Sequence, residues 1–257
     1  EEQVKQGASL IININASPYD IHKSETRKEI VMKKALKLNV PIIYLNMVGG
    51  QDELVFDGGS FVVNGLGEII YQASSFKEEV FHLDIDLKTN KQNDKSPLII
   101  RPKTIELKDV ESKASLSKNE SIYSALKLGL KDYVRKNKFT KVLIGISGGI
   151  DSALTAAICV DALGAENVIG VAMPSKYNSK DSFDDAIKLS DNLGITLKTI
   201  EIEKLVDDFR ETLTNSLSEE LGQITDENIQ SRVRGNVLMG LSNQTGAMVV
   251  STGNKSE

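Results

Sequence analysis

Val142-Leu143-Ile144-Gly145-Ile146-Ser147-Gly148-Gly149-Ile150-Asp151-Ser152 is the stretch that decides the fold of the second half of this chain. Its first five residues are apolar or small and predict a buried strand over 142–146. A Ser-Gly-Gly turn follows, and then a small and apolar segment predicts a helix over 152–163 that Gly164 ends. A strand that passes through a tight turn directly into a helix is the start of a βαβ unit.

The residues of this turn suit an anion and a cation together. Gly148 and Gly149 let the backbone approach a ligand closely and adopt positive φ. Free N–H groups at the start of the helix favour an anion, and Ser147 and Ser152 add hydroxyl donors. The carboxylate of Asp151 would repel a bare phosphate, but it fits if Mg²⁺ bridges it to the phosphates. We therefore predict a pyrophosphate site with magnesium; the alternative is a plain strand-to-helix turn capped by Asp and Ser.

The region over 119–257 alternates strands with helices and predicts an α/β fold with a doubly wound parallel sheet. Asn119 is the expected N-cap of its first helix. The turn fits neither Gly-x-x-x-x-Gly-Lys-Ser/Thr nor Gly-x-Gly-x-x-Gly, which disfavours ordinary P-loop and dinucleotide-binding folds. Further strands are expected over 168–172, 196–202 and 247–251, and further helices over 119–137, 181–193, 203–216 and 225–242.

The region over 1–86 has a different order of elements. Its pattern predicts β-α-β followed by a meander, with a hairpin around the Asn-Gly and Gly turns at 64–67. Between the two regions, residues 87–118 are polar and without period, which predicts a linker. The strands of the first region are expected over 10–15, 41–46, 60–63, 68–71 and 80–85, and its helix over 23–38.

Composition excludes several classes of protein. The 257 residues are 40% hydrophobic and 26% charged, which is enough apolar material for a core. A net charge of −5 argues against a mainly electrostatic nucleic-acid binder. No apolar run approaches the ~18 residues of a membrane span. A single cysteine, Cys159, allows neither an intrachain disulfide nor a multi-cysteine zinc site, and we expect it to pack in a core. The chain starts without Met and ends in a loop, so we expect an internal piece of a longer protein.

Three stretches in the second region point to a known family. Ser147-Gly148-Gly149-Ile150-Asp151-Ser152 resembles the pyrophosphate loop of the N-type ATP pyrophosphatases, which cleave ATP between the α and β phosphates. Residues 227–235 (ENIQSRVRG) and 251–257 (STGNKSE) resemble the dinucleotide-binding helix and a later segment of the NAD synthetases, in that family's order. The resemblance implies that 119–257 is the first part of a doubly wound NAD synthetase domain.

The resemblance also implies roles for particular residues. It places Asn228 and Glu257 on deamido-NAD, and Asp151 and Glu257 on Mg²⁺. Arg232 lies one turn after Asn228, whereas Arg234 points elsewhere; for both arginines the alternative is a solvated helix face. The resemblance implies that ATP contacts Gly145, Ile146, Ser147, Gly148, Gly149, Ile150, Asp151, Ser152 and Thr252.

The first region resembles the C-terminal half of a nitrilase-type glutaminase, which implies part of an α+β sandwich. Residues 13–19 (NINASPY), the helix from Lys23 and residues 46–60 carry the resemblance, which places Ser17 and Lys23 on glutamine. For Lys23 the alternative is an ordinary charged residue at a helix start. The catalytic Glu, Lys and Cys of such a glutaminase would lie before residue 1, and Cys159 is no substitute for that cysteine. Asp57 could be mistaken for part of a carboxylate site, but we favour a loop or interface role.

Together the resemblances imply a glutamine-dependent NAD synthetase fragment that amidates deamido-NAD through an adenylate. The expected partners are ATP, deamido-NAD and glutamine or ammonia, with Mg²⁺ and without nucleic acid or membrane. We expect a cytoplasmic homo-oligomer. Two alternatives remain: another ATP-pyrophosphate amidoligase, or a nucleotide-binding fragment without glutaminase activity of its own.

Overall fold

The computed structural model describes residues 1–85, 87, 113–175, 180–217 and 220–252. The chain divides into two compact units, Glu1–Gly129 and Leu130–Glu257, and each is described here by itself. Among the described residues, no helix has both the length and the apolar composition needed to cross a bilayer.

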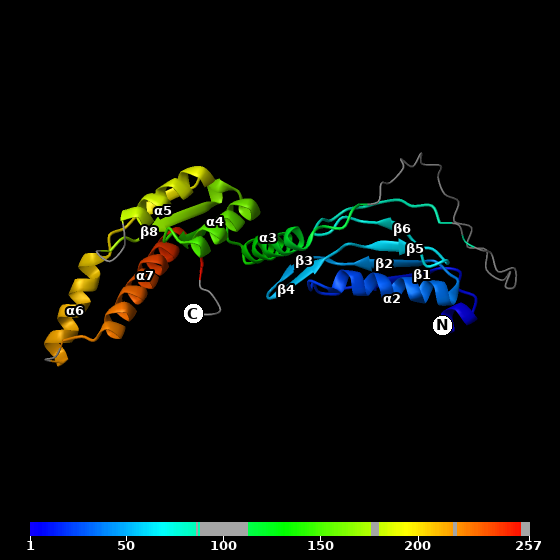
Figure 1. Ribbon diagram of the computed structural model, residues 1–257, viewed down its shortest axis with the longest axis horizontal. Helices are drawn as coiled ribbons and strands as arrows, with labels where there is room; N and C mark the ends of the chain where they lie inside the picture. The colour runs from blue at the N-terminus through cyan, green and yellow to red at the C-terminus, as the bar shows by residue number, and fades with distance from the viewer. Residues whose placement is uncertain (86, 88–112, 176–179, 218–219, 253–257) are drawn as a thin grey trace. The chain divides into compact units, whose positions relative to one another are not determined.

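The first unit is built on a four-stranded sheet of order β1-β2-β5-β6 (Figure 1). β1 and β2 are parallel, and the two other pairs are antiparallel, as the predicted β-α-β unit and hairpin require. A separate antiparallel pair, β3-β4, follows β2 in the chain. The elements are α1 (Glu2–Lys5), β1 (Ile11–Asn15), α2 (Lys23–Leu38), β2 (Ile42–Asn46), β3 (Val48–Gln51), β4 (Leu54–Asp57), β5 (Phe61–Val63) and β6 (Ile69–Gln72).

Apolar side chains pack on both faces of this sheet, although Ile12 and Ile14 of β1 are exposed. On one face, Val31 and Ala35 of α2 pack against residues such as Tyr44 and Phe61, whose rings stack at 4.9 Å. On the other face, the cluster around Val62 receives side chains from the segment after β6. Helix α2 therefore packs along one face only (Figure 1).

The predicted strand over 80–85 is wrong. The backbone there has no strand pairing, although Phe81, Leu83 and Ile85 pack against the sheet. Alternation of apolar and polar residues indicates only that one side of an extended segment is buried. A segment that lies on the face of a sheet buries one side in this way without hydrogen-bonding to a neighbouring strand. The hairpin of β3 and β4, in contrast, was not predicted from the pattern.

The second unit contains the predicted parallel sheet, with strand order β10-β7-β8-β9 and every neighbouring pair parallel. Its helix α3 begins in the first unit, so the boundary at Gly129 falls inside a helix. The elements are α3 (Lys118–Lys136), β7 (Val142–Gly145), α4 (Ile150–Leu163), η1 (Ala165–Asn167), β8 (Val168–Ala172), α5 (Lys180–Leu193), β9 (Thr196–Thr199), α6 (Glu203–Leu217), α7 (Gln223–Thr245) and β10 (Met248–Val250).

Helices cover both faces of this sheet, which confirms the doubly wound prediction. Side chains of α3, α4 and α5 pack with Val142 and Ile144 on one face. Side chains of α6 and α7 pack with Leu143 and Val171 on the other. Successive side chains of the buried strand β7 therefore point alternately into the two cores on opposite faces of the sheet.

The N-cap of α3 differs from the prediction. The helix starts one residue before Asn119, and Ser117 caps it instead. The Ser117 N–H and hydroxyl both donate to the Glu120 carboxylate, at 2.9 and 2.6 Å, and the Glu120 N–H donates back to Ser117 Oγ at 3.4 Å. This reciprocal capping box satisfies more backbone donors than an isolated Asn cap.

Candidate functional site

The loop between β7 and α4 is shaped by a glycine that no other residue could replace without strain. Gly148 has φ +80°, and a Cβ on it would lie 2.2 Å from the carbonyl oxygen of Ser182 at the start of α5. The backbone of the loop therefore lies directly against α5. Only glycine combines this φ with so close an approach.

Hydroxyl groups hold the loop in this shape. Gly149 N–H donates to Ser147 Oγ at 3.2 Å, and Ser147 N–H donates to Ser152 Oγ at 3.3 Å. Ser152 Oγ in turn donates to the Gly149 carbonyl at 2.9 Å. The two predicted hydroxyl donors thus bind the loop itself in this structure.

Three backbone donors of the loop remain available to an anion. Within the described part of the chain, nothing accepts a hydrogen bond from the amides of Gly148, Ile150 and Asp151. Ile150 and Asp151 form the first turn of α4, where the helix dipole adds positive potential. Neighbouring free amides at a helix start are the arrangement that binds phosphate groups.

A cavity of about 330 Å³ opens beside this loop. That volume lies at the lower end of the range for small-molecule sites. The carboxyl ends of β7 and β8 both reach it, as expected for a ligand site in an open α/β sheet. It is lined by Gly145, Ile146, Ser147, Ala172, Met173, Pro174, Ser182, Phe183, Ala186, Arg234, Leu238 and Thr252.

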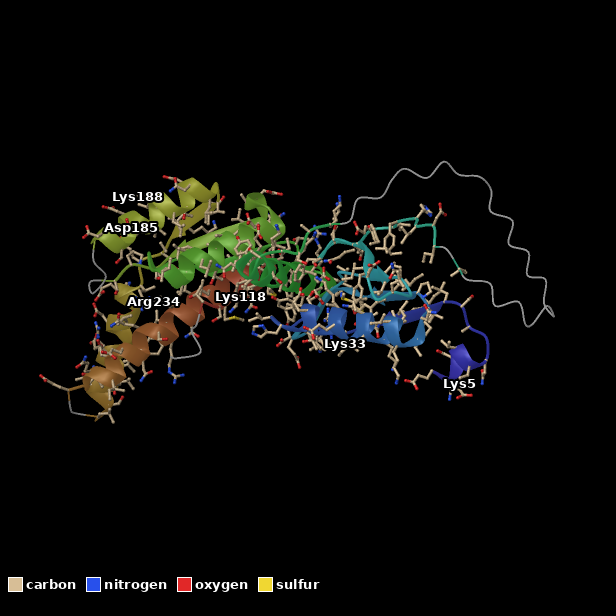
Figure 2. All side chains as sticks on the ribbon, turned by 45° about the vertical axis from the view of Figure 1, so that its right-hand side comes forward. Lys5, Lys33, Lys118, Asp185, Lys188 and Arg234 are labelled. Carbon is tan, nitrogen blue, oxygen red and sulfur yellow. The ribbon has the colours of Figure 1, made fainter. Side chains whose placement is uncertain are left out.

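Arg234, which the sequence left open between a ligand-binding residue and a solvated helix face, lines this cavity. It extends from α7 (Figure 2), is partly buried and lines the cavity, where its Nη2 donates to Ser175 Oγ at 3.5 Å. Burial lowers the pKa of its guanidinium below the ordinary value. The available signal was the spacing of Gln230, Arg234 and Leu238, which puts all three on one helix face.

The other predicted residues of this site are only partly brought together. Thr252 lines the cavity, while Asn228 and Arg232 lie exposed on α7. Asp151 is exposed in the first turn of α4, so its carboxylate is accessible to a cation beside the free amides. Glu257 and residues 176–179, which belong to the loop after β8, lie outside the described residues. No group of three or more possible metal ligands occurs among the described residues, so the Mg²⁺ site stays a prediction.

Ser17, in the first unit, lies just after β1 and is bonded through every polar atom. Its N–H donates to Asn46 Oδ1 at 2.9 Å, and its carbonyl accepts from Asn46 Nδ2 at 3.2 Å and from Arg27 Nη2 at 2.9 Å. Its Oγ accepts from Arg27 Nε at 3.2 Å. Lys23, the first residue of α2, is partly buried, and no described residue bonds its ammonium group.

Asp57 is the ion-pair partner of Arg27. Arg27 Nη1 lies 2.8 Å from both Asp57 oxygens, and the residues are 8% and 5% exposed. Asp57 ends β4 and forms a buried ion pair inside the first unit. It is therefore neither part of a carboxylate cluster nor a plain loop residue.

Cys159 packs in the core of the second unit, as predicted. It lies on α4, is fully buried and contacts the apolar face of the sheet. Burial raises the pKa of its thiol to about 11. A thiol in this setting stays protonated and cannot serve as a nucleophile near neutral pH.

The fold defines a doubly wound α/β domain with a Ser-Gly-Gly loop after β7, and a second α/β unit precedes it in the chain. The sequence profile of the NAD synthase family matches residues 122–257, and that of the carbon-nitrogen hydrolases matches residues 3–93. The chain belongs to the NAD synthase family, with a carbon-nitrogen hydrolase segment before it.

Curated relatives carry both segments. The chain is 45% identical to a glutamine-dependent NAD(+) synthetase of Thermotoga maritima, over 98% of this chain and 47% of that protein. It is 40% identical to the enzyme of that name from Acinetobacter baylyi, over 98% of this chain and 44% of that protein. The chain thus spans about half the length of the curated relatives it matches.

A solved structure supports the fold over the whole chain. The glutamine-dependent NAD+ synthetase of Acinetobacter baumannii, solved in complex with adenosine diphosphate, is 41% identical and superposes with a TM-score of 0.85. The match covers 100% of this chain and 46% of that chain.

Proposed function

We propose that the protein makes NAD by amidating deamido-NAD, at the expense of ATP and with ammonia taken from glutamine. The observation that carries the proposal is the β7–α4 loop: Ser147 lines the cavity, and three amides without an acceptor among the described residues follow it directly in the chain. The printed names of the relatives, which share both segments, support the substrates.

The chemistry assigned to the second unit needs no side-chain nucleophile. A carboxylate oxygen of deamido-NAD attacks the α-phosphorus of ATP, the bond to the bridging oxygen breaks, and pyrophosphate leaves. Ammonia then attacks the acyl carbon of the adenylate and expels AMP, which leaves NAD. The amides of Gly148, Ile150 and Asp151 stabilise the charge that develops on the phosphates.

Other residues complete the proposed sites. Thr252 contacts ATP, Asn228 and Glu257 contact deamido-NAD, and Asp151 with Glu257 would hold Mg²⁺. The metal, when bound, neutralises charge on the phosphate oxygens. Ser17 and Lys23 bind glutamine in the first unit. The proposal includes a homo-oligomer in the cytoplasm.

The test is turnover by the full-length protein with ATP, Mg²⁺ and deamido-NAD, using glutamine or ammonium in turn. We expect one pyrophosphate and one AMP for each NAD formed with either nitrogen donor. If deamido-NAD is not amidated and another substrate is aminated instead, such as xanthylate at a ring carbonyl carbon, the protein is a different ATP-pyrophosphate amidoligase. If ATP binds without turnover, the protein is a nucleotide-binding module.

A further inference from the structure

The guanidinium group of Arg27 donates hydrogen bonds within the first unit through all three of its nitrogens. Its Nε donates to Ser17 Oγ, its Nη2 donates to the carbonyls of Ser17 and Pro18 at 2.9 and 2.8 Å, and its Nη1 contacts both oxygens of Asp57. The two oxygens of one carboxylate lie too close together for each N–H bond of Nη1 to point at a different oxygen, so these contacts engage at least four of the five N–H donors of the arginine. Because Arg27 is also only 8% exposed, we expect it to act through its neighbours.

The neighbour that it controls most directly is the hydroxyl of Ser17. A guanidinium group donates and never accepts, so Ser17 Oγ must be the acceptor in their contact. The hydroxyl proton of Ser17 then has to point toward a different acceptor. No described residue supplies one, and Ser17 is only partly buried. The pair consequently presents Ser17 as a hydrogen-bond donor.

Asn46 fixes the backbone beneath that hydroxyl. Its side-chain amide bonds both the N–H and the carbonyl of Ser17, and it is itself 9% exposed. Asn46 Nδ2 also lies 3.2 Å from the Gly58 carbonyl, next to Asp57 in the chain. Ser17 is thereby held from both sides, by α2 through Arg27 and by the end of β2 through Asn46.

Lys23 lies on the same side of α2 as Arg27. The two residues are one helical turn apart, so their side chains leave the same face of the helix. Arg27 thus couples the turn at Ser17 to the helix that carries the ammonium group of Lys23. The Ser17 hydroxyl, as a donor, and the Lys23 ammonium group together suit a ligand that offers oxygen acceptors.

We propose that Arg27, held by Asp57, is a positioning residue for glutamine use: it orients the Ser17 hydroxyl to donate to an oxygen atom of glutamine. The inference rests on the proposed function, which assigns glutamine to Ser17 and Lys23. It adds that Arg27 contributes without touching the substrate.

The test is a double-mutant cycle in the full-length protein, with kcat/KM measured separately for glutamine and for ammonium. Arg27→Lys keeps the charge but cannot donate to Ser17 and Asp57 together. We expect it to lower kcat/KM for glutamine by about 10- to 100-fold, the effect of losing a hydrogen bond to a charged group. Ser17→Ala should lower it similarly. In the Ser17→Ala background, Arg27→Lys should cost less than about 2-fold more, because the hydroxyl that it orients is gone.

Lys28→Met is the matched control. Lys28 follows Arg27 on α2, is equally buried at 8%, and bonds Glu25 and Ser115 instead of Ser17. We expect its glutamine kcat/KM to stay within about 2-fold of wild type. If Arg27→Lys fails to fold, Asp57→Asn replaces it, since it loosens the guanidinium without removing it.

Three outcomes would overturn the inference. They are an equal loss with both nitrogen donors, full additivity of the Ser17 and Arg27 effects, or a glutamine-selective loss in Lys28→Met. The wild-type protein decides the proposed function separately: if it forms NAD from ammonium but never from glutamine, the glutamine assignment itself fails.

Discussion

A Cβ atom on Gly148 would lie 2.2 Å from the carbonyl oxygen of Ser182, although the two residues belong to different β-α connections. Gly148 follows β7, and Ser182 is in the first turn of α5, after β8. This approach presses the loop with the free amides against the helix that lines the far side of the cavity. The shape of the site therefore requires that residue 148 have no side chain.

Gly148→Ala should lower both stability and ATP binding. The positive φ alone costs about 1–2 kcal/mol for a residue with a Cβ, and the backbone of Ser182 would also have to move. Thermal unfolding and equilibrium ATP binding of the full-length protein measure the two effects. Gly240→Ala on α7 is the control, because its Cβ meets nothing within 4 Å and alanine favours a helix by roughly 0.5–1 kcal/mol. Equal thermal midpoints for both variants would contradict the steric argument.

Asp151→Asn should abolish magnesium-dependent adenylation and leave the fold intact. The carboxylate is exposed, so its replacement removes no core contact. An amide is a much weaker ligand for Mg²⁺ than a carboxylate. Pyrophosphate release and circular dichroism would be measured together. Near-normal turnover in the folded variant would show that Asp151 does not bind the cation.

Arg234→Met should weaken binding of phosphate-bearing substrates by about 10-fold or more, because it removes the positive charge that α7 brings to the cavity. Lys188→Met is a suitable control: Lys188 lies on α5, which also lines the cavity, but it is exposed and pairs with Asp185 at 3.3 Å (Figure 2). Substrate KM values for the two variants give the comparison. A loss of the same size in Lys188→Met would mean that only net charge matters.

Cys159 should make stability fall at alkaline pH. Its pKa is about 11 in the folded protein and near 9.0 ordinarily, so the unfolded chain loses the thiol proton first as pH rises. The contribution is complete below about pH 9 and disappears as pH approaches 11. The difference in thermal midpoint between wild type and Cys159→Ala should therefore shrink across that window. A thiol reagent at pH 8 should react only after unfolding; rapid reaction of the folded protein would refute the burial argument.

The parts of the fold that were predicted correctly are those with strong local signals. β8 and α2 match their expected ranges residue for residue. In α2, the helix period ends at Asn39, whose φ of 52° closes the helix shortly before Pro41. The strand, turn and helix around Gly148 were also predicted, because two consecutive glycines between apolar segments indicate a tight turn.

The remainder depended on residues far apart in the chain. Arg27 and Asp57 are 30 positions apart, and nothing near either one indicates that they form a buried pair. The β3-β4 hairpin contains Gly49, Gly50 and polar residues at its turn, so its pattern lacks the apolar alternation of a strand. The sequence placed Arg234 only relative to Asn228, on a different face of the helix. It could not show that the cavity lies on the face of Arg234 and not on that of Asn228.

The hydrogen bonds among Ser147, Gly149 and Ser152 give the loop a preorganised form. Because its own hydroxyls fix the backbone, the conformational entropy of these residues is lost during folding and not when a nucleotide arrives. The same serines would exchange partners on contact with a phosphate, since their hydroxyls can both donate and accept. If the loop binds a nucleotide as proposed, replacing either serine should weaken that binding both by loosening the loop and by removing a contact.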